Sequence, residues 1–131
     1  MIVTFMNQRR ELNKEEIILV EYLAGKAKYQ LEKNWYNGYK ALTMNDGGMG
    51  SILLIPDNLP QQERVFKAQI ADCVLKDVDN MDIIVSLNID QNDYLFELDI
   101  WKCDYTSVKK IVGLQDLYEK RDVPPCVVDW L

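Results

Sequence analysis

The sequence contains no histidine, and this absence excludes several kinds of functional site. Without an imidazole the chain has no Ser-His-Asp or Cys-His centre, no histidine-ligated metal and no histidine-based pH switch. Cysteine is scarce too: Cys73, Cys103 and Cys126 are widely spaced and form no C-x-x-C pair. A zinc site, a thioredoxin-like motif or a disulfide framework is therefore not expected. We expect three buried thiols that pack as small hydrophobic groups in a reducing cytosol.

Long apolar runs are missing as well. No window approaches the ~18 apolar residues of a membrane span. The apolar residues 1–6 come before Arg9 and Arg10, which is the reverse of the order in a signal peptide. We therefore expect a cytoplasmic protein that does not enter membranes. Lys and Arg number 15 against 21 Asp and Glu, a net charge of −6. Such a chain repels nucleic acid and anionic lipid.

The 131 residues, of which 48% are apolar, fit one globular domain spanning residues 1–131. The clearest local signal is a helix over residues 13–24. Asn13 is a good N-cap, and Glu16 completes a capping box three residues later. Gly25 is expected to end this helix. Its apolar stripe consists of Ile17, Val20, Leu23 and Ala24.

Alternating patterns predict strands over 39–44, 51–55, 82–90 and 94–102. We also favour a strand over 65–76, although a helix over 61–75 is an alternative. The last two strands should form a hairpin with one buried and one solvated face. The buried side comprises Ile83, Val85, Leu87, Ile89, Phe96, Leu98 and Ile100, and the solvated side Asp82, Ser86, Asn88, Asp90, Glu97, Asp99 and Trp101. The prediction is an α+β fold: a four- or five-stranded, mainly antiparallel sheet with the N-terminal helix packed on one face.

The pattern weakens after residue 106. A helical turn is possible over 114–120, and the apolar tail 127–131 should dock on the body of the protein.

A glycine-rich segment, Asp46–Ser51, connects the first two expected strands. Backbone amides of such turns can cradle phosphate. This one lacks the lysine of a P-loop and precedes a strand rather than a helix, so we favour a structural turn. Asp46 and Met49 remain candidate binding residues.

Negative charge is concentrated between residues 72 and 104. This stretch holds nine acidic side chains and two lysines, a net charge of −7 against −6 for the whole chain. An EF-hand is excluded, because Met81 and Asp82 stand where the loop requires an oxygen ligand and a glycine. We expect Asp77, Asp79 and several other acids to form turns.

The solvated face of the last strand carries the main functional candidates. Glu97 and Asp99 should stand side by side, ~7 Å apart. Paired carboxylates can act as acid and base or hold a hard cation. Trp101 among these acids is also typical of a protein-binding surface, in which an aromatic anchor is bordered by steering charges. Lys102 and Asp104 extend this set.

These motifs resemble an uncharacterised bacterial family of small soluble proteins. The resemblance covers residues 9–112 and rests on Arg10–Glu16, Asp46–Ser51, Leu87–Asp90 and Phe96–Lys102. The Asp104–Ser107 exit lacks the family's proline. The family has no established activity, but its small acidic members resemble the immunity proteins encoded beside secreted bacterial toxins.

Two functional hypotheses follow. The first is a non-catalytic, cofactor-free acidic module that binds a protein with a basic surface, for example an immunity-type inhibitor of a toxin. The second is a small ligand- or divalent-cation-binding domain, or an enzyme, that uses Glu97 and Asp99 near the Gly47–Gly50 turn. A third, structural alternative is that Asp99 accepts hydrogen bonds from the glycine turn and Trp101 packs over it.

Overall fold

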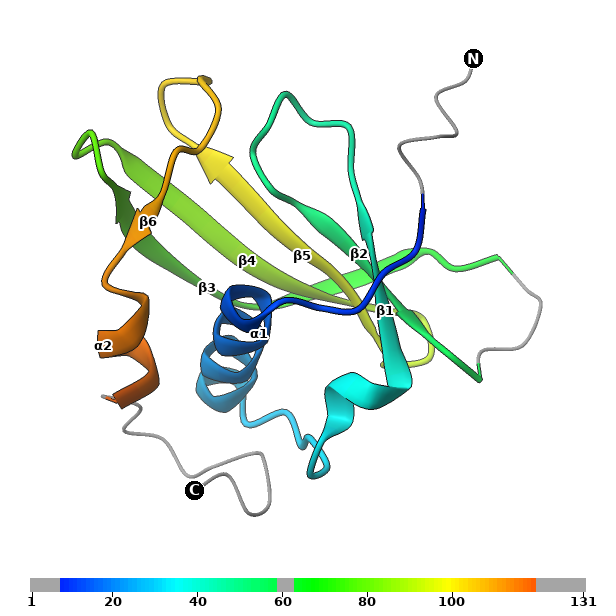
Figure 1. The fold of residues 1–131 in the computed structure, drawn as a ribbon. Helices are drawn as coiled ribbons and strands as arrows, with labels where there is room; N and C mark the ends of the chain where they lie inside the picture. The colour runs from blue at the N-terminus through cyan, green and yellow to red at the C-terminus, as the bar shows by residue number, and fades with distance from the viewer. Residues whose placement is uncertain (1–7, 59–62, 120–131) are drawn as a thin grey trace.

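A computed structural model of the chain describes residues 8–58 and 63–119 (Figure 1). The elements are α1 (Lys14–Ala27), the 3-10 helix η2 (Trp35–Gly38), β1 (Tyr39–Thr43), β2 (Ile52–Pro56), β3 (Phe66–Asp77), β4 (Asp82–Asp90), β5 (Leu95–Lys102), β6 (Ile111–Val112) and α2 (Leu114–Glu119).

The strands form one sheet with the order β1-β2-β5-β4-β3-β6, and every pair is antiparallel. An α+β fold with a helix packed on an antiparallel sheet is therefore confirmed. The expected strand number was too low, since the described residues form six strands. The additional one, β6, has two residues and pairs only with Lys76 and Asp77. A strand this short gives no alternating pattern to detect in the sequence.

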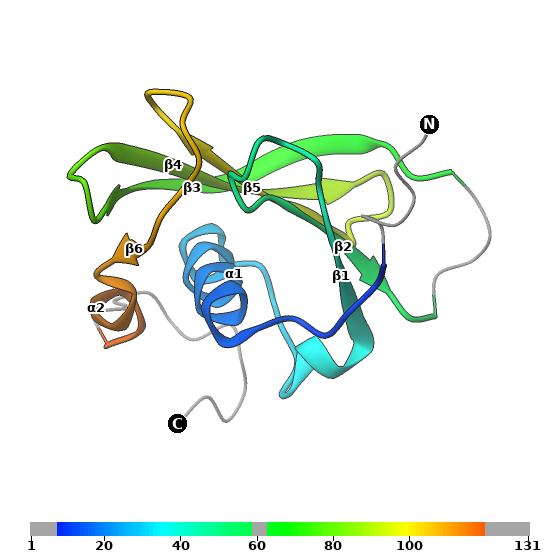
Figure 2. The same ribbon diagram turned by 45° about the horizontal axis from the view of Figure 1, so that its top comes forward.

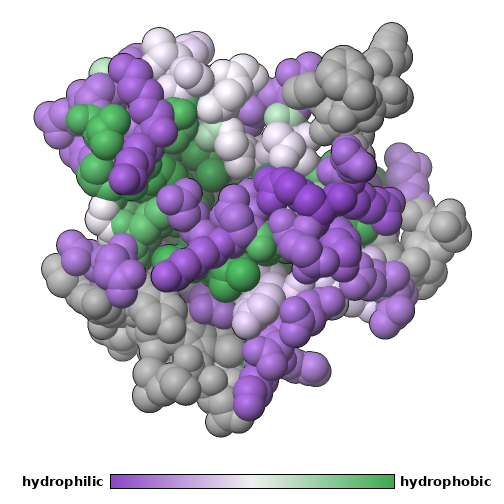
Figure 3. Space-filling view, viewed as in Figure 1, coloured by the Kyte–Doolittle hydropathy of each residue, from purple (hydrophilic) through white to green (hydrophobic). Residues whose placement is uncertain are grey.

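Both helices lie on the same side of the central strands (Figures 1 and 2). We call this the inner face of the sheet and the opposite side the outer face. Figure 3 shows the side that carries α1, where hydrophilic side chains dominate the centre of the view.

Helix α1 begins as expected. The Asn13 side chain accepts from the Glu16 amide, and the Glu16 carboxylate accepts from the Asn13 amide. The predicted end was wrong, because Gly25 lies within the helix and Lys28 caps it in the left-handed conformation, with φ 57°. The predicted stripe was too narrow: α1 packs against β3, β4 and α2, so more of its circumference is buried. The buried apolar residues of the helix are Ile18, Leu19, Val20, Leu23 and Ala24.

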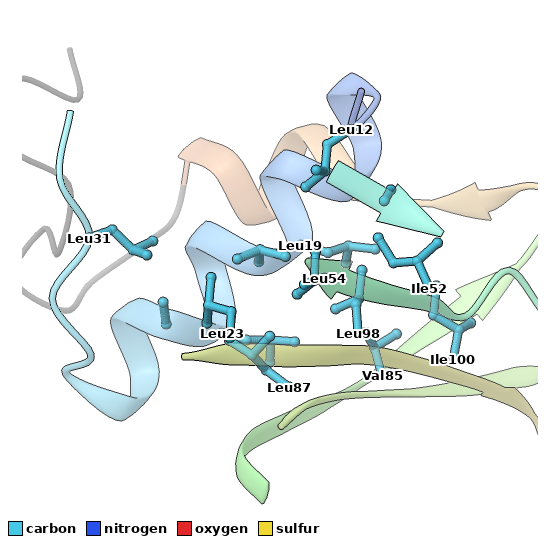
Figure 4. Close-up of a cluster of buried hydrophobic side chains, with 14 of the residues drawn as sticks. Leu12, Leu19, Leu23, Leu31, Ile52, Leu54, Val85, Leu87, Leu98 and Ile100 are labelled. Carbon is cyan, nitrogen blue, oxygen red and sulfur yellow. The ribbon is translucent and has the colours of Figure 1, made fainter. Parts of the chain in front are cut away.

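The hydrophobic core lies between α1 and the inner face of the sheet (Figure 4). Leu19 and Leu23 of α1 point toward the strands. The strands contribute alternate residues, as a period of two requires. The strand residues of this core cluster are Ala41, Ile52, Leu54, Ile83, Val85, Leu87, Leu95, Leu98 and Ile100.

The β4–β5 hairpin confirms the predicted buried side except at Phe96. A β-bulge pairs Asn88 with Glu97 but Ile89 with Leu95, so Phe96 has no partner on β4. Leu95 takes the buried place and has no exposed surface. Phe96 is displaced into partial exposure, and the guanidinium carbon of Arg64 lies 4.9 Å from its ring centroid.

The polar side of β4 was predicted to be solvated, but three of its residues are buried. Ser86 and Asn88 retain only 7% of their exposure, and Asp90 retains none. β4 is flanked on both sides, so Ser86 lies between Asp72 and Asp99, and Asn88 lies between Gln69 and Glu97. Asp90 is buried because it binds Arg64, with Nε 2.8 Å from the carboxylate.

Strand β3 confirms the favoured interpretation of residues 65–76, and the helical alternative is wrong. Helix α2 confirms the helical turn after residue 113. The apolar tail 127–131 and Cys126 lie outside the described residues. The expectation of buried thiols is wrong for Cys103, which follows β5 in an exposed turn, and Cys73 is half-buried. No helix among the described residues is both long and apolar enough to cross a membrane.

Candidate functional site

The outer face of β5 carries three of the predicted site residues. Glu97, Asp99 and Trp101 alternate with Leu98 and Ile100, which are buried on the inner face. Asp99 is exposed, Glu97 is half-buried, and the Trp101 side chain retains 40% of its exposure. The predicted grouping of acids and an indole on one accessible face is therefore present.

An apolar row crosses the outer face at the level of Trp101. Trp101 on β5 is directly opposite Ile84 on β4, and Ile84 is directly opposite Val74 on β3. Ile84 is 37% and Val74 is 62% exposed. Directly opposed side chains on one face are in contact range, so the three form a continuous strip.

Tyr105, in the turn after β5, lengthens this strip. Its ring lies edge-on to Trp101, with 4.8 Å between ring centroids and an interplanar angle of 70°. Tyr105 is nevertheless 73% exposed. Val74, Ile84, Trp101 and Tyr105 are called the apolar row below.

Carboxylates border the apolar row on one side. Two residues along each strand from the apolar row, Asp99 is opposite Ser86, and Ser86 is opposite Asp72. Asp99 accepts from the Ser51 hydroxyl at 3.2 Å, and Asp72 accepts from the Gln69 amide at 3.2 Å. Both partners are neutral, and within residues 8–58 and 63–119 neither carboxylate forms an ion pair. Asp72 and Asp99 are called the acidic row.

The other border of the apolar row is electrically balanced. There, Lys76 of β3 is opposite Asp82 of β4, and the two charged groups lie 2.6 Å apart. Among the strand residues that flank the row, uncompensated negative charge therefore lies on one side only. Farther along, the half-buried Glu97 accepts from the Asn88 amide at 3.1 Å, which fixes its carboxylate against the sheet.

Lys102 does not belong to this face. Its side chain points to the inner side and is fully buried, with Nζ 2.9 Å from Asp77 and 2.6 Å from Asp79. We expected Lys102 to lie with Glu97, Asp99 and Trp101 on the exposed face, and this expectation is wrong. Hydrogen bonds to Asp79 and Asp77 raise the pKa of Lys102. The ammonium also donates to the Ser107 carbonyl at 3.3 Å, which ties the loop after β5 to the sheet.

Asp77 completes this buried cluster. Its carboxylate accepts from the backbone amides of Lys109 and Lys110, both at 2.7 Å. Burial alone would raise the pKa of Asp77, but these hydrogen bonds, with those from Lys102 and Val78, hold it well below its usual range. Asp79 lies in the predicted turn, whereas Asp77 is the last residue of β3, and its carbonyl closes the turn by accepting from the Asn80 amide. Asp77 also anchors the segment that leads into β6.

Asp104 lies at the start of the exposed turn that carries Tyr105. It accepts from the Thr106 hydroxyl at 2.7 Å and from the Thr106 amide at 3.0 Å. The hydroxyl contact is the main reason that the pKa of Asp104 is lowered. Asp104 thus shapes the turn and adds negative charge beside the apolar row.

The Asp46 carboxylate holds the glycine turn together. Asp46 accepts from the backbone amides of Met49 and Ser51, both at 3.1 Å. The role that the structural alternative gave to Asp99 therefore belongs to Asp46. Met49 is buried, and its sulfur accepts from the Lys102 amide at 3.2 Å. Asp46 and Met49 therefore build the turn.

Ser51 connects this turn to the acidic row. Its hydroxyl contacts both Asp99 and the backbone of Ile100, so the turn and β5 are joined through one side chain. In the part of the chain that the structure describes, no three His, Cys, Asp or Glu side chains are grouped to hold a metal ion.

Four residues of the outer face were missed as a site by the sequence reasoning. Val74, Ile84 and Asp72 become neighbours of Trp101 and Asp99 only through the register of β3, β4 and β5. Tyr105 reaches Trp101 through the turn that follows β5. The sequence did contain one signal: Val74 and Ile84 occur on the polar side of their alternating patterns. Apolar residues at such positions, on strands expected to pair, indicate an exposed strip.

The sequence pattern of one protein family matches residues 9–112. No curated protein and no solved structure shows significant similarity to the chain. The matched range extends from the segment before α1 to the end of β6, and so includes the whole outer face. The chain belongs to the family described as a domain of unknown function, DUF6984.

Proposed function

We propose that this protein is a non-catalytic binding module whose outer sheet face docks a protein with a basic surface. The observation that carries this proposal is the apolar row with uncompensated carboxylates along one border. A partly exposed tryptophan with aliphatic neighbours offers apolar surface whose burial would stabilise a complex. Trp and Tyr are also enriched among the residues that contribute most to binding free energy. The carboxylates would steer a cationic partner and fix its orientation.

The alternative of a ligand-binding or catalytic site receives less support from the geometry. Glu97 is fixed to Asn88, and Asp99 contacts Ser51. Two amides of the glycine turn, at Met49 and Ser51, are occupied by Asp46. The groups that such a site would need are thus engaged within the fold.

An immunity-type role is one specific form of this proposal. In that case the partner is a toxin encoded beside this chain, and the acidic face covers a cationic surface of the toxin. Its expected signature is protection of cells that produce the toxin, with loss of protection in the double variant Trp101→Ala, Asp99→Asn.

Photo-crosslinking in the native cells tests the general proposal. A benzoylphenylalanine introduced at Tyr105 should capture one defined protein, whereas the same residue at the exposed Glu32 should not. The purified partner should then bind the chain with an on-rate that falls at least roughly tenfold as ionic strength rises. Absence of a crosslink at Tyr105, or an on-rate indifferent to salt, would overturn the proposal.

A further inference from the structure

The outer face also indicates what shape of partner it accepts, a step that rests on the proposed function. β4 and β5 each have a hydrogen-bonded neighbour on both sides. A peptide strand can therefore be added near the apolar row only at the edge of β3, where β6 pairs with Lys76 and Asp77 alone, and a strand added there would not cover Ile84 or Trp101. An occupant of this row must satisfy its own backbone hydrogen bonds before it docks, as an α-helix does.

The dimensions of the row match a short length of helix. Val74, Ile84 and Trp101 lie opposite one another on three adjacent strands. Strands are ~4.8 Å apart, so the row runs about 10 Å across the sheet before Tyr105 extends it. Two turns of α-helix span about 11 Å. A helix laid across the strands would place apolar side chains at i, i+3 or i+4, and i+7 on the row.

The position of the charges determines which helix fits. Asp72 and Asp99 lie one level along the strands from Val74 and Trp101, a separation of ~7 Å. Lys76 and Asp82 on the other border neutralise each other. We infer that the outer face binds an amphipathic helix whose apolar stripe is bordered on one side by lysine or arginine.

The same charges argue against the other occupants of an exposed apolar strip. A second copy of this face would bring Asp72 and Asp99 against the same two carboxylates or against the Lys76–Asp82 pair, and neither border offers an unpaired cation. Anionic lipid would meet the same repulsion, because the stretch 72–104 carries a net charge of −7. The lysine or arginine side chains of a cationic helix would instead be attracted to the Asp72 and Asp99 carboxylates.

A model peptide provides the first test. The probe is an 18-residue helix of leucine and lysine with leucine at i, i+3, i+4 and i+7, compared with a scrambled peptide of equal composition. Amide chemical-shift changes should centre on residues 72–74, 84–86 and 99–105, and tryptophan fluorescence should shift to the blue in the unmodified chain but not in Trp101→Phe. The scrambled peptide should bind at least tenfold more weakly. Equal binding of both peptides would show charge attraction alone and overturn the inference.

A matched pair of variants provides the second test. Val74 and Val65 are both exposed valines, at 62% and 50%, but Val65 lies at the other end of the sheet. Val74→Thr should weaken binding of the striped peptide several-fold, and Val65→Thr should leave it unchanged. Trp101→Ala should weaken it at least tenfold. Equal effects of the two valine variants, or self-association or binding to phosphatidylglycerol vesicles that depends on Trp101, would overturn the inference.

The partner captured through Tyr105 separates this inference from the proposed function. If that partner binds Val74→Thr and Ile84→Thr as tightly as the unmodified chain, the helix inference fails and the proposed function stands. If the striped peptide binds at the row but no cellular protein is captured, the inference stands and the proposed function fails.

Discussion

The ammonium of Lys102 lies 2.9 Å from the carboxylate of Asp77, and neither side chain has any exposed surface. This buried pair joins the end of β5 to the β3–β4 turn. Through the amides of Lys109 and Lys110 it also holds the segment after the exposed turn of Tyr105. The geometry of the apolar row therefore depends in part on a buried ionic cluster.

Breaking this pair should destabilise the protein. Lys102→Met leaves Asp77 as a buried carboxylate without its cation, which costs more than the ion pair itself contributes. We expect the Tm to fall on the order of 10 °C. Lys109→Met, which removes an exposed lysine at 3.6 Å from Asp79, serves as the control and should change the Tm little. Equal effects in thermal melts would contradict this role.

The same cluster predicts how stability varies with pH. The folded-state pKa of Asp77 is lowered, so its contribution is complete above the unfolded-state value of about 4 and declines as the pH falls toward the folded value. The pKa of Lys102 is raised, so its contribution is complete below about 10 and is lost in stronger alkali. Urea unfolding should show a stability difference between the unmodified chain and Asp77→Asn that is constant from pH 5 to 9 and shrinks below pH 4. A difference that grows in acid would contradict it.

Gly48 is expected to tolerate substitution less well than Gly47. Both residues have positive φ, 83° and 77°, so alanine is strained at either position. A Cβ on Gly48 would also lie 2.8 Å from the Ser107 Cβ, whereas nothing lies within 4 Å of one on Gly47. Gly47→Ala should cost about 1 kcal/mol from backbone strain, and Gly48→Ala about 1–3 kcal/mol more.

A double variant separates the two costs at Gly48. Ser107→Gly removes the atom that the new methyl group would meet. In that background the excess cost of Gly48→Ala over Gly47→Ala, measured by urea unfolding, should largely disappear. Persistence of the full excess would show that the turn and the loop after β5 do not approach as described.

Arg64 is expected to be irreplaceable by lysine. Its guanidinium donates to the carbonyls of Leu54 and Leu95 at 2.8 and 2.7 Å, and to the Asp90 carboxylate at 2.8 Å. Residue pairing between β2 and β5 ends one residue before Leu54, so Arg64 bridges the strands where the ladder stops. A lysine ammonium cannot reach three acceptors in this fork geometry. Arg64→Lys should cost on the order of 2 kcal/mol in urea unfolding. A cost below about 0.5 kcal/mol, the scale of ordinary surface changes, would contradict this bridge.

Local sequence rules predicted the elements whose causes are local. The capping box of Asn13 and Glu16, the alternation of β4 and the turn residues around Asp90 depend on neighbours within a few positions. The end of α1 was missed because packing against β3 and α2 stabilises a longer helix than Gly25 alone would allow.

Only the part of the candidate site that lies within β5 could be predicted from the sequence, because alternation within one strand is a local property. Alternation along β5 brings Asp99 and Trp101 to one face, and the same period places Lys102 with Leu98 and Ile100 on the other. The alternation alone therefore places Lys102 on the inner face. Ile84 and Val74 became neighbours of Trp101 through the register between strands, which depends on the whole sheet.

The cysteines should differ in reactivity. Cys73 is half-buried on the inner face, and burial raises its pKa to about 11, whereas Cys103 is exposed in the turn after β5. The thiolate is the nucleophile, so at pH 8 only about a thousandth of Cys73 would be reactive. In a Cys126→Ser background, iodoacetamide should modify Cys103 first, as read by mass spectrometry of tryptic peptides. The rate at Cys73 should rise roughly tenfold per pH unit up to pH 10. Urea should bring the two rates together, and equal rates without urea would contradict the described burial of Cys73.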